Sequence, residues 1–147
     1  MSNPGPAITT SIHPQNLASN QAVRVIAMAK GVSVGALGDI AIPVIDTAFW
    51  VPTSYVIANA NNAGAAANVS SVALGLYTAA SGGGVAIRAT AALSSQTTVA
   101  YVTTAASATT ATATSAQNVY VNQTTATAAG TVDVYVYGYD LSGPQTN

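Results

Sequence analysis

The clearest structural signal in the chain is the C-terminal stretch Val132-Asp-Val-Tyr-Val-Tyr-Gly-Tyr139. Valine alternates along it with polar or aromatic residues, and successive side chains of an extended strand point to opposite faces. One face therefore forms a core stripe of three valines, Val132, Val134 and Val136. The opposite face carries a row of three tyrosines, Tyr135, Tyr137 and Tyr139. The pattern predicts a β-strand whose second face is half wet or contacts a partner.

Similar β-favouring runs precede this strand, with turn-forming residues between them. They cover residues 23–29, 39–46, 49–58, 69–78, 85–90, 97–103 and 119–124, and the last run of the chain covers 132–139. About eight short strands predict an all-β protein, an antiparallel β-sandwich.

Two of these runs carry further core stripes, and two contain proline. The stripes are Ile40, Ile42 and Val44 in one run, and Val72, Leu74 and Leu76 in the other. Pro43 and Pro52 fall inside predicted strands, which favours edge strands or bulges at both places because proline cannot donate to the ladder. The glycine run ending at Gly84 predicts a hairpin loop.

The first 22 residues differ in composition from the rest of the chain. They hold three of the six prolines, Pro4, Pro6 and Pro14. Proline fixes its own φ and restricts the preceding residue to extended conformations. We therefore expect an extended N-terminal arm over residues 1–22, a sandwich domain over 23–141 and a C-terminal tail over 142–147.

Charge is scarce in this chain of 147 residues: three Lys and Arg and four Asp make 5% of the sequence, against about 25% in a typical domain. So few cations predict no nucleic-acid partner and no attachment to an anionic membrane. The N-terminus lacks the basic start and apolar core of a secretory signal, and no long apolar run predicts a membrane span. We expect neutral contacts that depend weakly on salt.

One stretch, Gly31-Val-Ser-Val-Gly35, matches the nucleophile elbow of serine hydrolases. That motif needs a helix after the turn and a histidine to accept the serine proton, whereas the single histidine, His13, lies upstream and the following residues predict a turn and a strand. With no Glu, no Cys and scattered aspartates, we expect no enzyme, no transition-metal site and no cofactor. A calcium site built from Asp and backbone carbonyls stays open.

The adjacent aromatics Phe49 and Trp50 suit either a sugar-stacking platform or core and interface packing, and packing is the commoner role. The candidate interface residues are those of the arm, this aromatic pair and the tyrosine row: Pro4, Pro6, Ile8, Ile12, His13, Phe49, Trp50, Tyr135, Tyr137 and Tyr139.

The segment Ala65-Ala-Ala-Asn-Val-Ser-Ser-Val-Ala-Leu-Gly-Leu-Tyr-Thr-Ala-Ala-Ser-Gly-Gly-Gly84, together with the terminal strand, resembles small capsid decoration, or cement, proteins of tailed bacteriophages. The likeness extends over residues 23–141 and lies in overall pattern and low charge. It implies a jelly-roll sandwich, made in the host cytoplasm, that joins the virion as a homotrimer on the outer capsid surface and binds the major capsid protein. No site residues of that family carry over.

A neutral surface rich in alanine and threonine independently suits such a role. Alanine, of which the whole chain has 31, has no side-chain entropy to lose on contact, and symmetry multiplies many weak contacts. We expect the arm to reach a neighbouring protomer or the capsid. The alternative is a carbohydrate-binding or adhesin-type β-sandwich in which Trp50, nearby tyrosines and residues 59–62 contact sugars.

Overall fold

A computed structural model of the chain describes residues 23–94, 102–104, 112–126 and 129–142. Within them every regular element is a strand, as the sequence predicts, and no helix occurs. The strands are β1 (Val23–Ser33), β2 (Gly38–Pro43), β3 (Trp50–Asn62), β4 (Ala65–Ala66), β5 (Ala73–Ala79), β6 (Gly83–Ala92), β7 (Val102–Thr104), β8 (Asn118–Thr125) and β9 (Thr131–Asp140).

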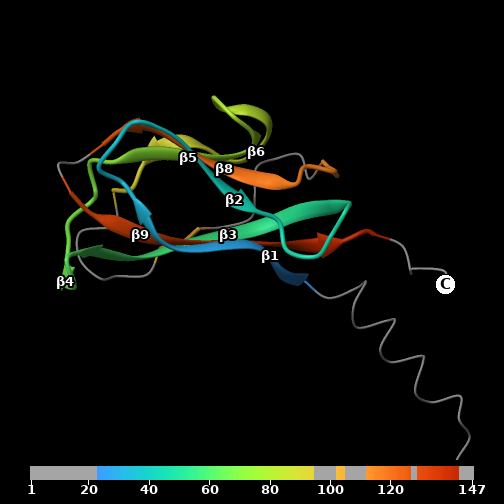
Figure 1. Ribbon diagram of the computed structural model, residues 1–147, viewed down its shortest axis with the longest axis horizontal. Coiled ribbons are helices and arrows are strands. Elements are labelled where there is room, and N and C mark those ends of the chain that lie inside the picture. The colour runs from blue at the N-terminus through green and yellow to red at the C-terminus, as the bar shows by residue number, and fades with distance from the viewer. Residues whose placement is uncertain (1–22, 95–101, 105–111, 127–128, 143–147) are drawn as a thin grey trace, which may run out of the picture.

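The strands form two sheets stacked face to face, the lower and upper layers of Figure 1. The lower sheet has the order β1-β9-β3-β4, with β7 also paired to β3, and the upper sheet has the order β2-β8-β5-β6. All pairings are antiparallel. The predicted all-β antiparallel sandwich is therefore confirmed.

The pairing within the sheets is nested. The first strand, β1, pairs with the last, β9, while β2 pairs with β8 and β3 pairs with β7. At the centre of the nest, β5 and β6 form a hairpin. Partners of these outer pairs are far apart in sequence, so the two ends of the described body meet in one sheet, where β1 begins beside the end of β9 (Figure 1).

The core lies between the two sheets and includes the predicted stripes. The six residues of the two clearest stripes lie in β9, in β5 and just before β5, and all are fully buried: Val72, Leu74, Leu76, Val132, Val134 and Val136. In β2, Ile42 is 1% exposed, and Ile40 in that strand and Val44 just after it pack against the core from the edge. The alternation in sequence thus identified the inward face of three strands.

Both prolines inside strands lie where proline is tolerated. Pro43 ends β2, which is an edge strand of the upper sheet. Pro52 precedes a register shift in the β3–β9 pairing, between Pro52 and Ser54, which marks a bulge. Residues 80–82 form the predicted β5–β6 hairpin loop. Gly84, near the start of β6, has a positive φ of 71°, a conformation that a side chain would strain.

Several strand boundaries differ from the sequence prediction; β1 and β3, for example, each extend four residues further, to Ser33 and Asn62. The predicted strand at 69–78 begins only at Ala73, because Val72 N donates to Val69 O in a tight turn at 2.9 Å. Val69 is nevertheless fully buried. The strand predicted at 39–46 stops at Pro43, and Asp46 has a positive φ of 44° that breaks the extended conformation. Of the predicted strand 97–103, residues 97–101 lie outside the described residues.

Candidate functional site

The outer face of the lower sheet is apolar and aromatic, and we call it the tyrosine face. The tyrosines of β9 stand opposite hydrophobic residues of both neighbouring strands, except that Tyr137 stands opposite Ser54 on the β3 side. The pairs on the β1 side are Tyr139 with Val23, Tyr137 with Val25 and Tyr135 with Met28. The pairs on the β3 side are Tyr139 with Val51, Tyr137 with Ser54 and Tyr135 with Val56.

Several of these side chains are well exposed. Met28 is 48% exposed, Val23 46% and Tyr139 38%, whereas Tyr135 and Tyr137 are half-buried between their neighbours. The predicted tyrosine row therefore lies on the outer face, as the alternation required. Scattered exposed hydrophobics are normal on a protein surface, but a contiguous patch is typical of an interaction surface.

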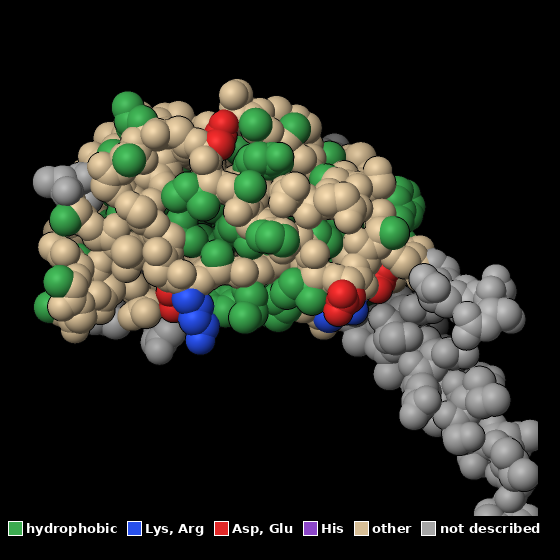
Figure 2. Space-filling view, viewed as in Figure 1, with side chains coloured by type: hydrophobic (Ala, Val, Ile, Leu, Met, Phe, Trp, Pro, Cys, Tyr) green, Lys and Arg blue, Asp and Glu red, His purple; other side chains and the backbone are tan. Residues whose placement is uncertain are grey.

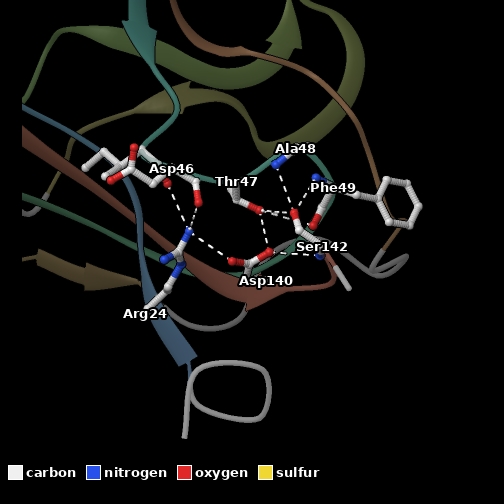
Figure 3. A network of polar contacts seen from close by, with 8 residues as sticks. Arg24, Asp46, Thr47, Ala48, Phe49, Asp140 and Ser142 are labelled. Carbon is white, nitrogen blue, oxygen red and sulfur yellow. Dashed lines mark hydrogen bonds and ion pairs between the residues drawn. The ribbon is translucent and has the colours of Figure 1, made fainter. Parts of the chain in front are cut away.

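The tyrosine face continues past the end of β9. Leu141 N donates to Phe49 O at 2.8 Å, which extends the β3–β9 pairing by one rung, and both residues are 44% exposed. In Figure 3 the ring of Phe49 points away from the neighbouring polar groups. Figure 2 shows hydrophobic side chains along this lower layer, with charged side chains at both ends of the row.

A polar network closes this end of the sandwich (Figure 3). Arg24 Nη2 lies 3.1 Å from Asp140 Oδ2 and also donates to Ile45 O at 3.0 Å and Asp46 O at 2.7 Å. Thr47 Oγ1 donates to Asp140 Oδ1 at 2.6 Å. The network therefore ties the β2–β3 loop to the start of β1 and the end of β9.

The same contacts set the protonation of Asp140. Burial alone raises the pKa of this carboxyl, but hydrogen bonds from Thr47 and Ser142 and the nearby charge of Arg24 outweigh burial. The net result is a pKa below the ordinary value, so the carboxylate stays ionised at neutral pH.

A carboxylate also clamps the other end of β9. Asp133 is 8% exposed, and its Oδ1 accepts from Gly31 N at 2.8 Å while its Oδ2 accepts from Asn59 Nδ2 at 3.1 Å. Gly31 and Asn59 both have positive φ, 67° and 57°. One side chain thus holds irregular positions of both flanking strands, β1 and β3, in place.

Two further charged groups serve the upper sheet. Asp39 accepts from Asn122 Nδ2 at 2.8 Å and from Ser81 N at 2.8 Å, and these bonds lower its pKa. Arg88, 9% exposed, donates to the backbone carbonyls of Leu74, Ala91 and Ala92. Five of the seven charged side chains therefore hold strands and loops of the fold together.

The outer face of the upper sheet is built mainly from small residues and flat rings. One row of paired residues crosses its four strands, from β2 through β8 and β5 to β6, and consists of Ala41, Tyr120, Tyr77 and Ala86. Tyr77 lies across Gly75, where a Cβ would collide with its ring, and its hydroxyl lies 2.9 Å from Thr90 Oγ1. We call this surface the alanine face; it offers few protruding side chains, and the charge of Asp39 at its β2 edge is already hydrogen-bonded.

Trp50 is a core residue, which corrects its place among the candidate interface residues. Its side chain is fully buried, and Nε1 donates to Ala116 O at 3.0 Å. Its backbone pairs with Thr114 in both directions, at 2.9 and 2.8 Å. A fully buried ring offers no stacking platform to a sugar, so the fold uses this indole for packing.

The serine motif lies at the end of a strand. Ser33 is the last residue of β1, β2 begins at Gly38, and no helix follows in the described residues. In that part of the chain no group of His, Cys, Asp and Glu is placed to hold a metal ion, nor is any helix long and apolar enough to cross a membrane. The arm candidates Pro4, Pro6, Ile8, Ile12 and His13 lie outside the described residues.

Sequence reasoning missed the β1 and β3 members of the tyrosine face. For β1 a signal was present in the sequence. In the run Val25-Ile-Ala-Met-Ala29 every position is apolar, odd and even alike, and this pattern is typical of a strand with both faces covered. Only the register identifies the tyrosines as their neighbours.

Comparison with protein-family models, with curated proteins and with solved structures finds no match.

Proposed function

We propose that this protein is a structural virion protein, a homotrimer that decorates the outer surface of a tailed-phage capsid and stabilises the lattice of the major capsid protein. The partner comes from the resemblance of residues 23–141 to decoration proteins. The observation that carries a binding role is the low charge of the outer surface. Of the charged residues of the upper sheet, Arg88 is buried and Asp39 accepts hydrogen bonds from Asn122 and Ser81, so the alanine face presents little charge to a partner.

The nested strand pairing supports the finer assignment of the sandwich to the jelly-roll type. A jelly roll is a double-sheet sandwich of eight strands arranged as two Greek keys. Pairing of β1 with β9, β2 with β8, β3 with β7 and β5 with β6 supports this assignment, with β4 as a two-residue addition to β3. A rigid body of this kind suits a clamp between capsid subunits, and it requires no catalytic group.

The alanine face is the surface we assign to the capsid. Alanine and glycine lose no side-chain entropy on contact, and the Tyr77 ring is already fixed by Thr90. In the view of Figure 2, Lys and Arg side chains occur only along the lower layer. Arg88, in β6 of the upper sheet, is 9% exposed and donates to the backbone carbonyls of Ala91 and Ala92. Contact through this face is expected to persist at high salt.

The experiment adds purified protein to phage heads assembled without it and measures occupancy by quantitative sedimentation. Ala41→Arg places a charged, bulky side chain on the exposed rung of the alanine face, and Ala36→Arg makes the same change in the β1–β2 turn. We expect Ala41→Arg to weaken binding at least about tenfold, a loss of roughly 1.4 kcal/mol, and Ala36→Arg to bind like the wild type. Absence of saturable binding by the wild type refutes the function.

A carbohydrate-binding module is the rival function. Trp50, the proposed stacking residue of such a module, is buried in the core. Asn59 donates to Asp133, and Asn61 accepts from Gly64 N, so both side chains already bond within the fold. Saturable glycan binding that disappears in Tyr139→Ala would favour the rival, since Tyr139 is the exposed tyrosine of the row.

A further inference from the structure

The tyrosine face is a second outward surface, distinct from the alanine face that we assign to the capsid. It spans four rungs, from Phe49 and Leu141 at one end to Tyr135 and Met28 at the other. Five of the seven exposed large hydrophobic side chains of the described residues belong to it: Val23, Met28, Phe49, Tyr139 and Leu141. A patch of this composition is typical of a surface that is covered in the assembled protein.

The chain itself contains an occupant of suitable length and chemistry. Residues 1–22 carry no Lys, Arg, Asp or Glu, so they match a face whose tyrosines and aliphatic residues are uncharged. They include Ile8, Ile12 and Leu17 as apolar anchors, and prolines that favour extended conformations. An extended peptide laid on tyrosines buries apolar area at low entropic cost when proline has already restricted it.

The point where this segment joins the body decides which copy it reaches. Val23, the first residue of β1, is itself part of the tyrosine face and pairs with Tyr139. Because β1 runs from Val23 towards Ser33 across that face, the chain before Val23 must reverse direction to cover its own face. It needs no reversal to continue onto an adjacent molecule.

Residues 1–22 are long enough to reach the tyrosine face of a neighbouring copy. Twenty-two residues in extended conformation span up to about 70 Å, whereas a domain of this size has a radius of gyration of only about 15 Å. A neighbouring body in contact is therefore within range. In a closed ring each copy gives one segment and receives one, so every tyrosine face becomes covered.

We propose that residues 1–22 of a second copy dock on the tyrosine face, so that exchanged N-terminal segments hold the oligomer together. The exchange requires the proposed homotrimer and adds to it the surface that receives the arm. Since the alanine face remains free, the same oligomer keeps its capsid-binding surface exposed.

The chain has no cysteine, so engineered cysteines report contacts without background. Two single variants of the full chain, Ile12→Cys and Met28→Cys, are made with different affinity tags, mixed, unfolded, refolded together and treated with a flexible bismaleimide. A third variant, Ala89→Cys, replaces Met28→Cys as the control, because Ala89 is exposed on β6 of the other sheet.

We expect a covalent product carrying both tags from Ile12→Cys with Met28→Cys, at least about fivefold more than with Ala89→Cys. The double variant Ile12→Cys/Met28→Cys is treated at high dilution as well. A product confined to single chains, or equal yields with Met28→Cys and Ala89→Cys, overturns the exchange.

Deletion of residues 2–20 supplies an independent readout. We expect the full chain to sediment as a trimer and the deletion variant to fall to monomers, with Trp50 fluorescence showing that the body is still folded. Trimers that persist without residues 2–20 contradict the proposal. Binding of the full chain to heads is measured separately. Cross-linking without head binding supports the exchange and refutes the capsid role. Head binding without cross-linking supports the capsid role and refutes the exchange.

Discussion

Replacement of Asp133 tests how the charged side chains are used. Asp133→Ala removes the acceptor of Gly31 N at 2.8 Å and of Asn59 Nδ2 at 3.1 Å. Each hydrogen bond to a charged group contributes about 1.5–3 kcal/mol. The substitution also removes the cost of burying a carboxylate, and Gly31 is an exposed residue whose amide bond to Asp133 is only partly buried. We therefore expect a loss near the lower limit, about 3 kcal/mol for the two bonds together.

A loss of that size lowers the melting temperature by about 6–12 °C in a chain of this length. The assay is urea unfolding followed by Trp50 fluorescence, since this single tryptophan is fully buried and reports loss of the core. The slope of the free energy of unfolding with urea should stay unchanged if both proteins unfold completely.

Asp133→Asn and Asp46→Asn provide the matched pair. Both remove one negative charge with little change of shape, but Asp46 is exposed on the β2–β3 loop whereas Asp133 is buried. We expect Asp133→Asn to cost about 1–1.5 kcal/mol, because the amide keeps one acceptor for Gly31 N, and Asp46→Asn to stay within about 0.5 kcal/mol. Equal effects of the two variants, or a loss below about 0.5 kcal/mol in Asp133→Ala, refute the clamp.

Three further substitutions test the core, a close contact and the acid response. Gly138→Ala places a Cβ against the carbonyl oxygen of Val51, which cannot move without breaking the sheet, so thermal unfolding should register a loss above about 3 kcal/mol. Trp50→Phe loses the bond from Nε1 to Ala116 O and leaves a gap, and calorimetry should give a loss of about 2–3 kcal/mol. Asp140 has a lowered pKa when folded, so its stabilising effect is present above its ordinary value of 3.8 and disappears as the pH falls through the folded value. Asp140→Asn should therefore be less stable than the wild type at pH 7 and flatter in stability below about pH 4, as urea titrations at each pH would measure; parallel curves contradict the assignment.

The sequence was sufficient for the strands whose two faces differ. In 132–139 only one register buries all three valines, so the alternation specifies both the strand and its inward face. Proline was equally informative, since Pro43 and Pro52 predicted the edge strand and the bulge that the fold contains. These signals are local in the sequence, so they can be interpreted before the pairing of the strands is known.

Pairing between distant strands left no local signal. Nothing in the tyrosine row indicates that Met28 and Val56 flank Tyr135, because the register depends on the nesting of β1 and β3 around β9. Trp50 shows the same limit: an aromatic pair at a strand start fits a surface or a core equally well. Its burial follows from the residues around Thr114, which arrive from far along the chain.

The most direct test of the proposed role is a cryo-EM reconstruction of phage heads, assembled without this protein and then saturated with it. The proposal predicts ordered density at symmetry-related positions on the outer surface, with β2, β8, β5 and β6 turned towards the major capsid protein and the sheet of β1 turned away. Bare heads at saturating protein, or density that contacts the capsid through the tyrosine face, would contradict it.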